Sequence, residues 1–261
     1  MKLNSLLVPI VTAVLASSAF AGSAGKVCTS CQPAAGEPNG LFDTVGATAT
    51  IGYDTDYVYR GVELAKNLIT AALDWNLKLD QTFSLNAGAW YGTSADDSFT
   101  GTGGGAYHEL DLYTSVLAKL GPVTAGLKYQ HYFFLGSTHN AIRDINELGV
   151  TLATSVAGFD LGAGGYYDFT AKGWYFEYSA SYPVKINDWL SLVPGVLVSH
   201  GHDYYGVNGG NHVKVGLAAP IRLTKTATLT PYIAGNLPIG SLKDNGERNR
   251  VYGGVALSVT F

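Results

Sequence analysis

The chain has 261 residues, of which only 14 % are charged, and it contains 33 Gly and 17 Tyr. Its formal net charge of −4 at pH 7 gives no basic surface, so we expect no nucleic-acid partner. The length suits one large all-β domain. Abundant Tyr and Gly with few charges are typical of strands that place aromatic residues at a membrane interface.

Residues 1–21 have the organisation of a secretory signal peptide. Lys2 precedes an apolar run over residues 6–16, and an A-x-A cleavage site ends at Ala21. A transmembrane anchor is the weaker alternative, because the run is short and contains Pro9. No later segment approaches the roughly 18 consecutive apolar residues of a spanning helix. We therefore expect export, cleavage of this segment, and membrane embedding by strands.

Residues 22–43 are small and polar, and they predict a flexible periplasmic linker. The linker carries Cys28 and Cys31 in a C-x-x-C spacing, for which we favour a local disulfide formed in an oxidising compartment. Free thiols or a metal shared with a partner are the alternatives. A c-type haem would need His where the chain has Gln32, and a redox motif would need a βαβ context. We expect no cofactor and no metal site.

From residue 44 onward, apolar and polar residues alternate in about twelve segments, as they do in strands with one apolar face. The expected strands cover residues 45–59, 69–79, 83–91, 109–120, 123–133, 147–152, 159–169, 174–182, 190–198, 213–222, 229–237 and 251–261.

The last segment has an apolar face that includes Val255, Leu257 and Val259 and ends on Phe261. A terminal aromatic after alternating apolar residues resembles the assembly signal of bacterial outer-membrane β-barrels, which implies the barrel-assembly machinery as a partner. In lipid this strand must pair with the first one, because an open edge leaves N–H and C=O groups unsatisfied. An edge strand of a soluble β-sandwich is the alternative.

The connections between these segments differ in length. Short turns are expected at residues 79–82, 120–123, 157–158, 187–188 and 224–226. Longer polar connections are expected at 61–67, 92–106, 135–145, 200–211 and 238–249, with a tighter one near 171–173, and we interpret 92–106 as a flexible surface loop. This alternation matches periplasmic turns and extracellular loops, and an even strand count places both termini in the periplasm.

Charged residues within the segments take the parity opposite to the apolar face. A lipid-facing Lys or Arg at mid-membrane costs ~2–4 kcal/mol, so a membrane barrel must follow this rule. We therefore predict a closed antiparallel transmembrane β-barrel of about twelve strands over residues 44–261. Its candidate lumen and selectivity residues are Asp54, Asp56, Arg60, Asp74, Lys78, Glu109, Asp111, Lys128, Glu147, Asp168, Glu177, Lys214 and Arg222. A structural ion-pair network is the alternative role for them.

Aromatic residues on the apolar face cluster near the predicted strand ends, as in the girdles at membrane–water interfaces. They are Tyr53, Tyr57, Tyr59, Trp75, Tyr91, Tyr129, Phe133, Trp174 and Phe261. Ordinary packing within a sheet is the alternative explanation.

The stretch 54–61 reads D-T-D-Y-V-Y-R-G and contains a D-Y-x-x-R-G motif from Asp56 to Gly61. This motif resembles a signature near the start of the Gcw_chp-type family, exported bacterial proteins without an assigned function. The resemblance implies an outer-membrane-type barrel and supplies no activity.

The functional expectation is a porin-like passive channel for small hydrophilic solutes in the bacterial outer membrane, with outer-membrane lipid around it. Inward carboxylates outnumber amines, which slightly favours cations. A non-conducting barrel that acts through its loops is the second hypothesis. A lipid-modifying enzyme built on His200 and His212 is the third. Ser199 and His200 point to opposite faces of a strand, so Ser199 with His212 is the remaining pair, and a metal site of His200, His202 and His212 lacks an identifiable second shell. We expect no enzyme.

Overall fold

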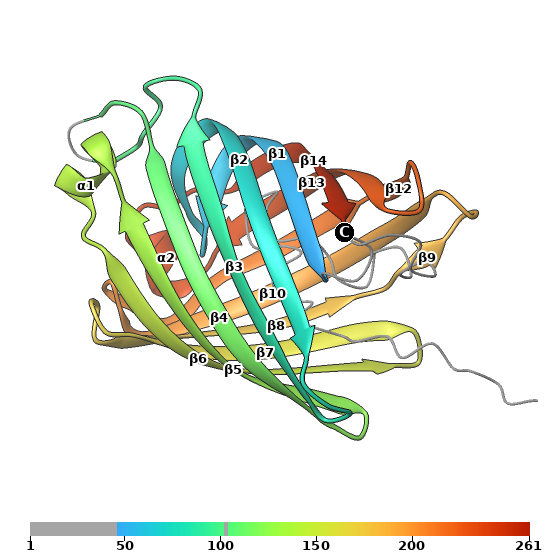
Figure 1. The fold of residues 1–261 in the computed structure, drawn as a ribbon. Helices are drawn as coiled ribbons and strands as arrows, with labels where there is room; N and C mark the ends of the chain where they lie inside the picture. The colour runs from blue at the N-terminus through green and yellow to red at the C-terminus, as the bar shows by residue number, and fades with distance from the viewer. Residues whose placement is uncertain (1–45, 102–103) are drawn as a thin grey trace, which may run out of the picture.

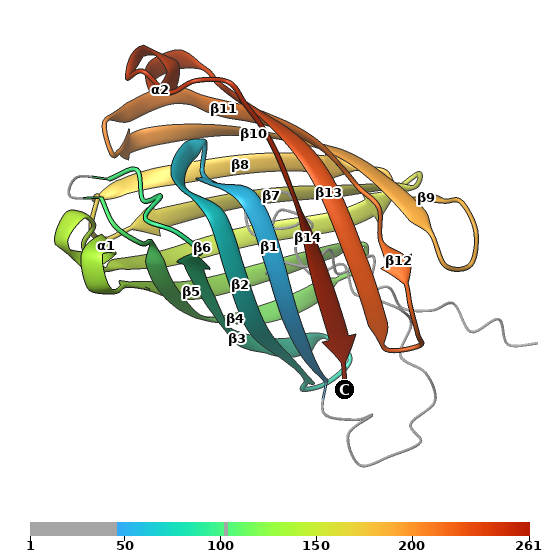
Figure 2. The same cartoon turned by 90° about the horizontal axis from the view of Figure 1, so that it is seen from above.

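The computed structural model describes residues 46–101 and 104–261, and in this part of the chain the long strands close into a barrel (Figures 1 and 2). The twelve long strands are β1 (Ala47–Tyr59), β2 (Val62–Lys78), β3 (Phe83–Ser94), β4 (His108–Leu120), β5 (Val123–Phe134), β6 (Ile145–Val156), β7 (Phe159–Asp168), β8 (Gly173–Ser181), β10 (Ser191–Tyr204), β11 (Val207–Ala218), β13 (Ala227–Pro238) and β14 (Arg250–Thr260). The predicted signal peptide (1–21), linker (22–43) and cysteine pair (Cys28, Cys31) lie outside the described residues.

The described ranges also contain four short elements: β9 (Val184–Lys185), β12 (Ile221–Arg222), α1 (Gly136–Ala141) and α2 (Gly240–Asp244). Within the described ranges, neither helix has the length and apolar character needed to cross a membrane.

The barrel closes by antiparallel pairing of its first and last strands. The register runs from Thr48 opposite Thr260 to Asp54 opposite Gly254. Every other long strand pairs antiparallel with its neighbours along the chain. The predicted closed antiparallel barrel of about twelve strands is confirmed, and closure satisfies the backbone groups that an open edge would leave bare.

The two faces of the wall differ as the alternation predicts. Large apolar side chains such as Ile51, Leu73 and Val150 are exposed on the outside. Polar side chains such as Thr50 and Glu109 are buried on the inside. An apolar outer band around a polar interior is the pattern of a membrane-spanning barrel, because the outer face then meets hydrocarbon.

At one end of the barrel, short turns are closed by polar side chains. Asp80 accepts the backbone N–H groups of Thr82 and Phe83 through Oδ1, which lowers the pKa of the Asp80 carboxyl. Asn187 Oδ1 and Thr224 Oγ1 accept N–H groups two and three residues later in the same way. Such local bonds stabilise tight turns, so the predicted turns form at this end.

Two connections predicted to be long are in fact tight hairpins. The predicted loop 61–67 belongs to β2, which begins at Val62, and only Arg60 and Gly61 connect it to β1. The predicted loop 200–211 is also wrong, because β10 and β11 continue to a turn at Tyr205 and Gly206. These two hairpins lie at the end of the barrel opposite the short turns. The other long connections, at 95–107, 135–144 and 239–249, lie at that end too.

The closing seam provides a test of the fold. A Cβ on Gly254 would lie 2.4 Å from Asp54 Oδ1 and 2.5 Å from the Tyr53 carbonyl oxygen. We expect Gly254→Ala to lower the free energy of unfolding by ~1–3 kcal/mol, measured by urea titration of the refolded protein in micelles. Gly235→Ala on β13 is the matched control, because its Cβ would meet its nearest atoms at 3.6 and 3.9 Å. Equal losses in both variants would contradict the assigned register.

Candidate functional site

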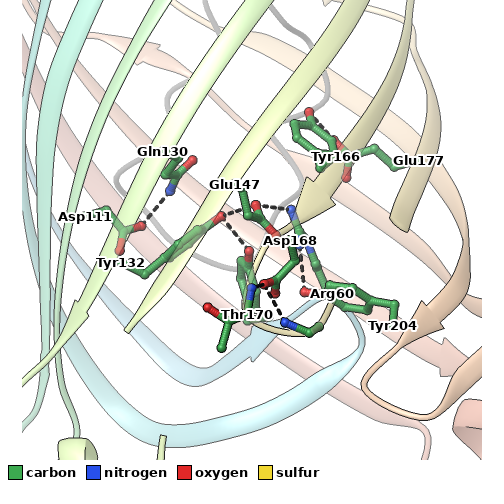
Figure 3. Close-up of polar contacts among 12 residues, drawn as sticks. Arg60, Asp111, Gln130, Tyr132, Glu147, Tyr166, Asp168, Thr170, Glu177 and Tyr204 are labelled. Atoms are coloured by element: carbon green, nitrogen blue, oxygen red, sulfur yellow. Dashed lines mark hydrogen bonds and ion pairs between the residues drawn. The ribbon is translucent and has the colours of Figure 1, made fainter. Parts of the chain in front are cut away.

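The hairpin of β1 and β2 leaves the barrel wall at the end where the long connections lie. β1 pairs with β14 only as far as Asp54, and β2 pairs with β3 only from Leu68 onward. Residues 55–67 therefore form a two-stranded ribbon of their own, which we call the inner ribbon. It bends inward into the barrel, as the blue hairpin in Figure 2 and the pale blue strands behind the sticks in Figure 3 show.

Local backbone features allow this bend. The pairing of β1 with β2 shifts register between Tyr57 and Val58, so one residue of β2 is left over as a bulge. Asn67 adopts φ +50°, a conformation that Asn tolerates better than most residues. Bulges and left-handed residues increase twist and turn a strand pair away from its sheet.

The tip of the inner ribbon is a two-residue turn with φ +47° at Arg60 and +92° at Gly61. Positive φ at both positions defines a type I′ turn, whose second position favours glycine. The tip is also tightly enclosed: a Cβ on Gly61 would lie 2.6 Å from Leu242 Cδ2 and 3.0 Å from His212 Nδ1. Glycine is therefore required by both backbone conformation and space.

Arg60 crosses the interior and binds the opposite wall (Figure 3). Its guanidinium makes a bidentate ion pair with Glu147 of β6, in which Nη2 lies 2.8 Å from Oε2. Nη1 also donates to the hydroxyl of Tyr204 on β10 at 2.7 Å. Tyrosine rings surround the cation, with the ring centroid of Tyr175 4.2 Å from Cζ. The side chains of Arg60 and Glu147 are only 10 % and 3 % exposed.

The partners of Glu147 complete this network. Tyr132 donates to Glu147 Oε2 at 2.9 Å, and Tyr59 in the inner ribbon donates to the Tyr132 hydroxyl at 2.7 Å. A buried ion pair is tolerated only where such bonds replace the lost water. The network therefore holds the ribbon tip against β5, β6 and β10.

The other side of the inner ribbon binds the closing strands. Asn236 Nδ2 of β13 donates to the Gly61 carbonyl at 3.1 Å, and Arg250 of β14 pairs with Glu63 at 2.7 Å. Glu63 and Arg250 are not among the predicted lumen residues, because Glu63 falls in the predicted loop 61–67 and Arg250 just before the last predicted strand. The alternation that continues through Val62 and Leu64 was the available signal for a hairpin.

An aromatic cluster anchors the base of the inner ribbon. Tyr57 stacks on Trp90 at 5.7 Å between ring centroids, and Tyr107 joins both Tyr57 and Phe99. Tyr57 and Tyr107 donate to the same oxygen of Glu109, at 2.9 and 2.7 Å. The prediction that Tyr57 belongs to the outer girdle is wrong, because the ribbon has left the wall.

Tyr59 is likewise inside the barrel rather than in the outer girdle, since its hydroxyl donates to the Tyr132 hydroxyl.

The connection between β3 and β4, predicted to be a flexible surface loop, packs against the inner ribbon. Phe99 is 5 % exposed, and the backbone N–H of Thr100 donates to the Leu64 carbonyl of the ribbon at 3.0 Å. This connection therefore covers one edge of the inner ribbon.

Five more inward carboxylates accept hydrogen bonds from neighbouring groups. Asp54 accepts from Tyr232, Asp74 from Tyr113, Asp111 from Gln130, Glu177 from Tyr166, and Asp168 from the backbone N–H groups of Thr170 and Ala171. Lys128 and Lys214 lie over the rings of Tyr113 and Tyr252. Asp56 is half-buried on the inner ribbon. The interior thus combines charges with tyrosines.

Two candidate lumen residues lie elsewhere. Lys78 is exposed at the end of β2, and Arg222 is exposed on β12, where it donates to the Asp188 carbonyl. Both lie at the end of the barrel with the short turns, Lys78 just before the turn at 79–82 and Arg222 just before the turn at 223–226. Alternation along the strand gave the correct parity but not the height of these residues in the barrel.

The Ser and His residues of the enzyme hypothesis divide between the two faces. Ser199 Oγ lies 2.8 Å from His212 Nδ1, and both residues are buried inside. His200 lies outside, where its ring stacks on Phe176 at 4.7 Å. Ser199 and His212 therefore face away from lipid, and the described part of the chain contains no cluster of potential metal ligands. This arrangement does not assemble a lipid-facing active site.

Comparisons with known proteins agree with this architecture. An outer membrane channel from Pseudomonas putida F1 matches with a TM-score of 0.54 and 13 % identity, over 87 % of this chain and 98 % of that one. A KdgM porin matches with a TM-score of 0.52 and 7 % identity, over 82 % and 99 % of the two chains. The chain has the outer-membrane β-barrel fold.

These identities establish the fold alone. No family model and no curated relative matches the chain, so the resemblance to the Gcw_chp-type family stays a prediction.

A double-mutant cycle tests the link between the ribbon tip and the far wall. We expect Arg60→Ala and Glu147→Ala each to cost ~3–5 kcal/mol of unfolding free energy, because each leaves a buried charge without its partner. The double variant should cost less than the sum, with a coupling of about 1–3 kcal/mol. Arg60→Lys should restore little, because an ammonium cannot form the bidentate fork.

Lys185 and Asp188 provide the control for this cycle. They pair at 2.7 Å with side chains 69 % and 87 % exposed, so their coupling should stay below about 1 kcal/mol. A coupling for Arg60 and Glu147 as small as that of the control pair would show that the ribbon tip is not held by this contact.

Proposed function

We propose that the protein is a passive channel for small hydrophilic solutes in the bacterial outer membrane, with the inner ribbon as its constriction. The position of the ribbon tip supports this proposal, because the tip reaches from the β1–β2 side of the barrel to Glu147 on β6 and Tyr204 on β10. A solute that passes along the barrel axis must pass beside this tip. The charged and hydroxyl groups around it suit hydrated solutes rather than lipids.

The charge of the interior supports a preference for cations. Apart from Asp56 and its cross-strand partner Lys66 on the inner ribbon, the inward carboxylates of the described residues are Asp54, Glu63, Asp74, Glu109, Asp111, Glu147, Asp160, Asp168 and Glu177, whereas the inward cations are Arg60, Lys128, Lys214 and Arg250. One matched structure is described as KdgM porin in complex with disordered oligogalacturonate, a polyanion. The present excess of carboxylates disfavours a polyanion, because rings of like charge repel it.

The position of the chain termini supports an orientation of the barrel in the outer membrane. The termini of the described barrel meet at the short turns, where Gly46 N donates to the Phe261 carbonyl at 3.1 Å. In outer-membrane barrels the short turns face the periplasm, so the inner ribbon would lie on the extracellular side, with lipid around the wall. The C-terminal strand would be the segment that the barrel-assembly machinery binds.

A non-conducting barrel is the second candidate, and the same inner ribbon favours it. Planar-bilayer recordings distinguish the two. We expect small, stable current steps from the wild type and a severalfold larger step from Arg60→Ala, because the ribbon tip loses its anchor on the far wall. Arg222→Ala is the matched control, since this arginine is exposed among the short turns. Silence from folded wild type and folded Arg60→Ala would dismiss the channel and leave the non-conducting barrel.

Ion selectivity provides a separate measurement. In a salt gradient, we expect the wild-type reversal potential to have the sign of cation preference. Asp54→Asn combined with Glu177→Gln should move it toward zero, because both carboxylates face the interior. Asp97→Asn, on the exposed connection between β3 and β4, should leave it unchanged. An anion-selective wild type would contradict the charge argument while leaving the channel intact.

A further inference from the structure

The outer face of the wall is hollowed over β6, β7 and β8. A groove of about 470 Å³ lies there, with Ala163 and Gly165 of β7 as its outward-facing floor. Val150 and Leu152 of β6 line one side, and Phe176 and Tyr178 of β8 line the other. We call this feature the β7 groove.

The β7 groove follows from the sequence of one strand. The outward residues of β7 are bulky at Phe159, Leu161 and Tyr167, but small at Ala163 and Gly165. The register places Leu152 and Tyr178 on either side of Ala163. Neighbouring strands lie ~4.8 Å apart, so the two rows of large side chains are separated by about 10 Å over a low floor. That width accommodates a single hydrocarbon chain.

The walls of the β7 groove fit an apolar occupant. Leu152 and Tyr178 are 48 % and 51 % exposed on the face that meets hydrocarbon. The aromatic wall is preorganised, because the rings of Trp174 and Phe176 stack at 5.8 Å with an interplanar angle of 11°. Rigid rings lose little conformational freedom when they bind a chain, so a lipid in the groove is held longer than a lipid on a flat wall.

Two exposed cations lie in the connections at one end of the β7 groove. Arg143 lies two residues before β6, and Lys172 lies directly before β8, so each cation precedes a strand that walls the groove. Both are exposed. The two connections are tied together, because Thr170 Oγ1 donates to the Asp144 carbonyl at 3.1 Å. Asp144 also lies at this end, where its Oδ1 accepts the Phe134 N–H at 3.0 Å.

We propose that the β7 groove binds one acyl chain of an anionic, phosphate-bearing membrane lipid, with Arg143 and Lys172 on its headgroup. The bilayer itself supplies the occupant of an outward apolar groove. The two cations at this end of the groove select a headgroup with negative charge, because an ion at the membrane interface is only partly screened. The site is independent of whether the barrel conducts.

The test uses the full barrel in nanodiscs that contain equal amounts of phosphatidylglycerol and phosphatidylcholine. Native mass spectrometry after release should show one retained phosphatidylglycerol on the wild type. Ala163→Leu fills the floor and should reduce retention about tenfold, because the added side chain takes the space of the acyl chain and removes its packing contacts. The double variant Arg143→Ala/Lys172→Ala should keep a retained lipid but lose the preference for phosphatidylglycerol.

Matched variants make the result decisive. Ala87→Leu adds the same side chain to the outer face of β3, and Lys119→Ala/Lys225→Ala removes two exposed cations at the opposite end of the barrel. Neither should alter retention, and all variants are first shown to be folded by their heat-modifiable electrophoretic mobility. Equal retention by Ala163→Leu and wild type would overturn the groove. Equal retention of the two lipids by the wild type would overturn the headgroup assignment, and a dimer lost in Ala163→Leu would assign the groove to a second copy.

Discussion

The ion pair between Arg60 and Glu147 is the interaction on which the interior arrangement depends. An arginine at the tip of a hairpin would ordinarily be hydrated, and moving it into the barrel removes that hydration. The bidentate carboxylate, the Tyr204 hydroxyl and the surrounding rings replace it. Without a carboxylate at this height on β6, the cost of removing the Arg60 guanidinium from water would not be offset, and the ribbon tip would not be stable across the interior.

The backbone of the inner ribbon must also be satisfied once it leaves the wall. Thr100 supplies an N–H to Leu64, and Ser98 exchanges hydrogen bonds with the backbone of Lys66, so the connection between β3 and β4 replaces a neighbouring strand. On the other edge, Thr55 Oγ1 accepts the Gly253 N–H at 3.1 Å. Side chains and the folded connection thus supply the hydrogen bonds that a neighbouring strand would otherwise make. Buried backbone N–H and C=O groups are rarely left unpaired, so the ribbon needs these bonds.

The wall could be predicted from the sequence, whereas the inward course of the inner ribbon could not. A period of two residues determines which face each side chain takes, and this rule placed Ile51, Asp54 and the closing strand correctly. The rule assumes that a strand stays in the sheet. Tyr57 and Tyr59 violate that assumption: beyond Asp54 both faces of the hairpin contact protein, so an apolar position no longer means an outward one. The partner of Arg60 is 87 residues away in sequence, and nothing local marks it.

Barrel width explains why the interior needs such an element. A barrel of eight strands is filled by its own side chains, whereas one of twelve leaves space along its axis. The tyrosines of this chain extend into that space, and Tyr132, Tyr204 and Tyr59 converge there on one ion pair and its hydroxyl network. The hydroxyl groups pair with charges while the rings fill volume, so a single residue type provides both polarity and bulk. The ribbon tip is held on the far wall by hydroxyl and ionic contacts, whereas its base is packed among aromatic side chains, so substituting Arg60 should free the tip and leave the base in place.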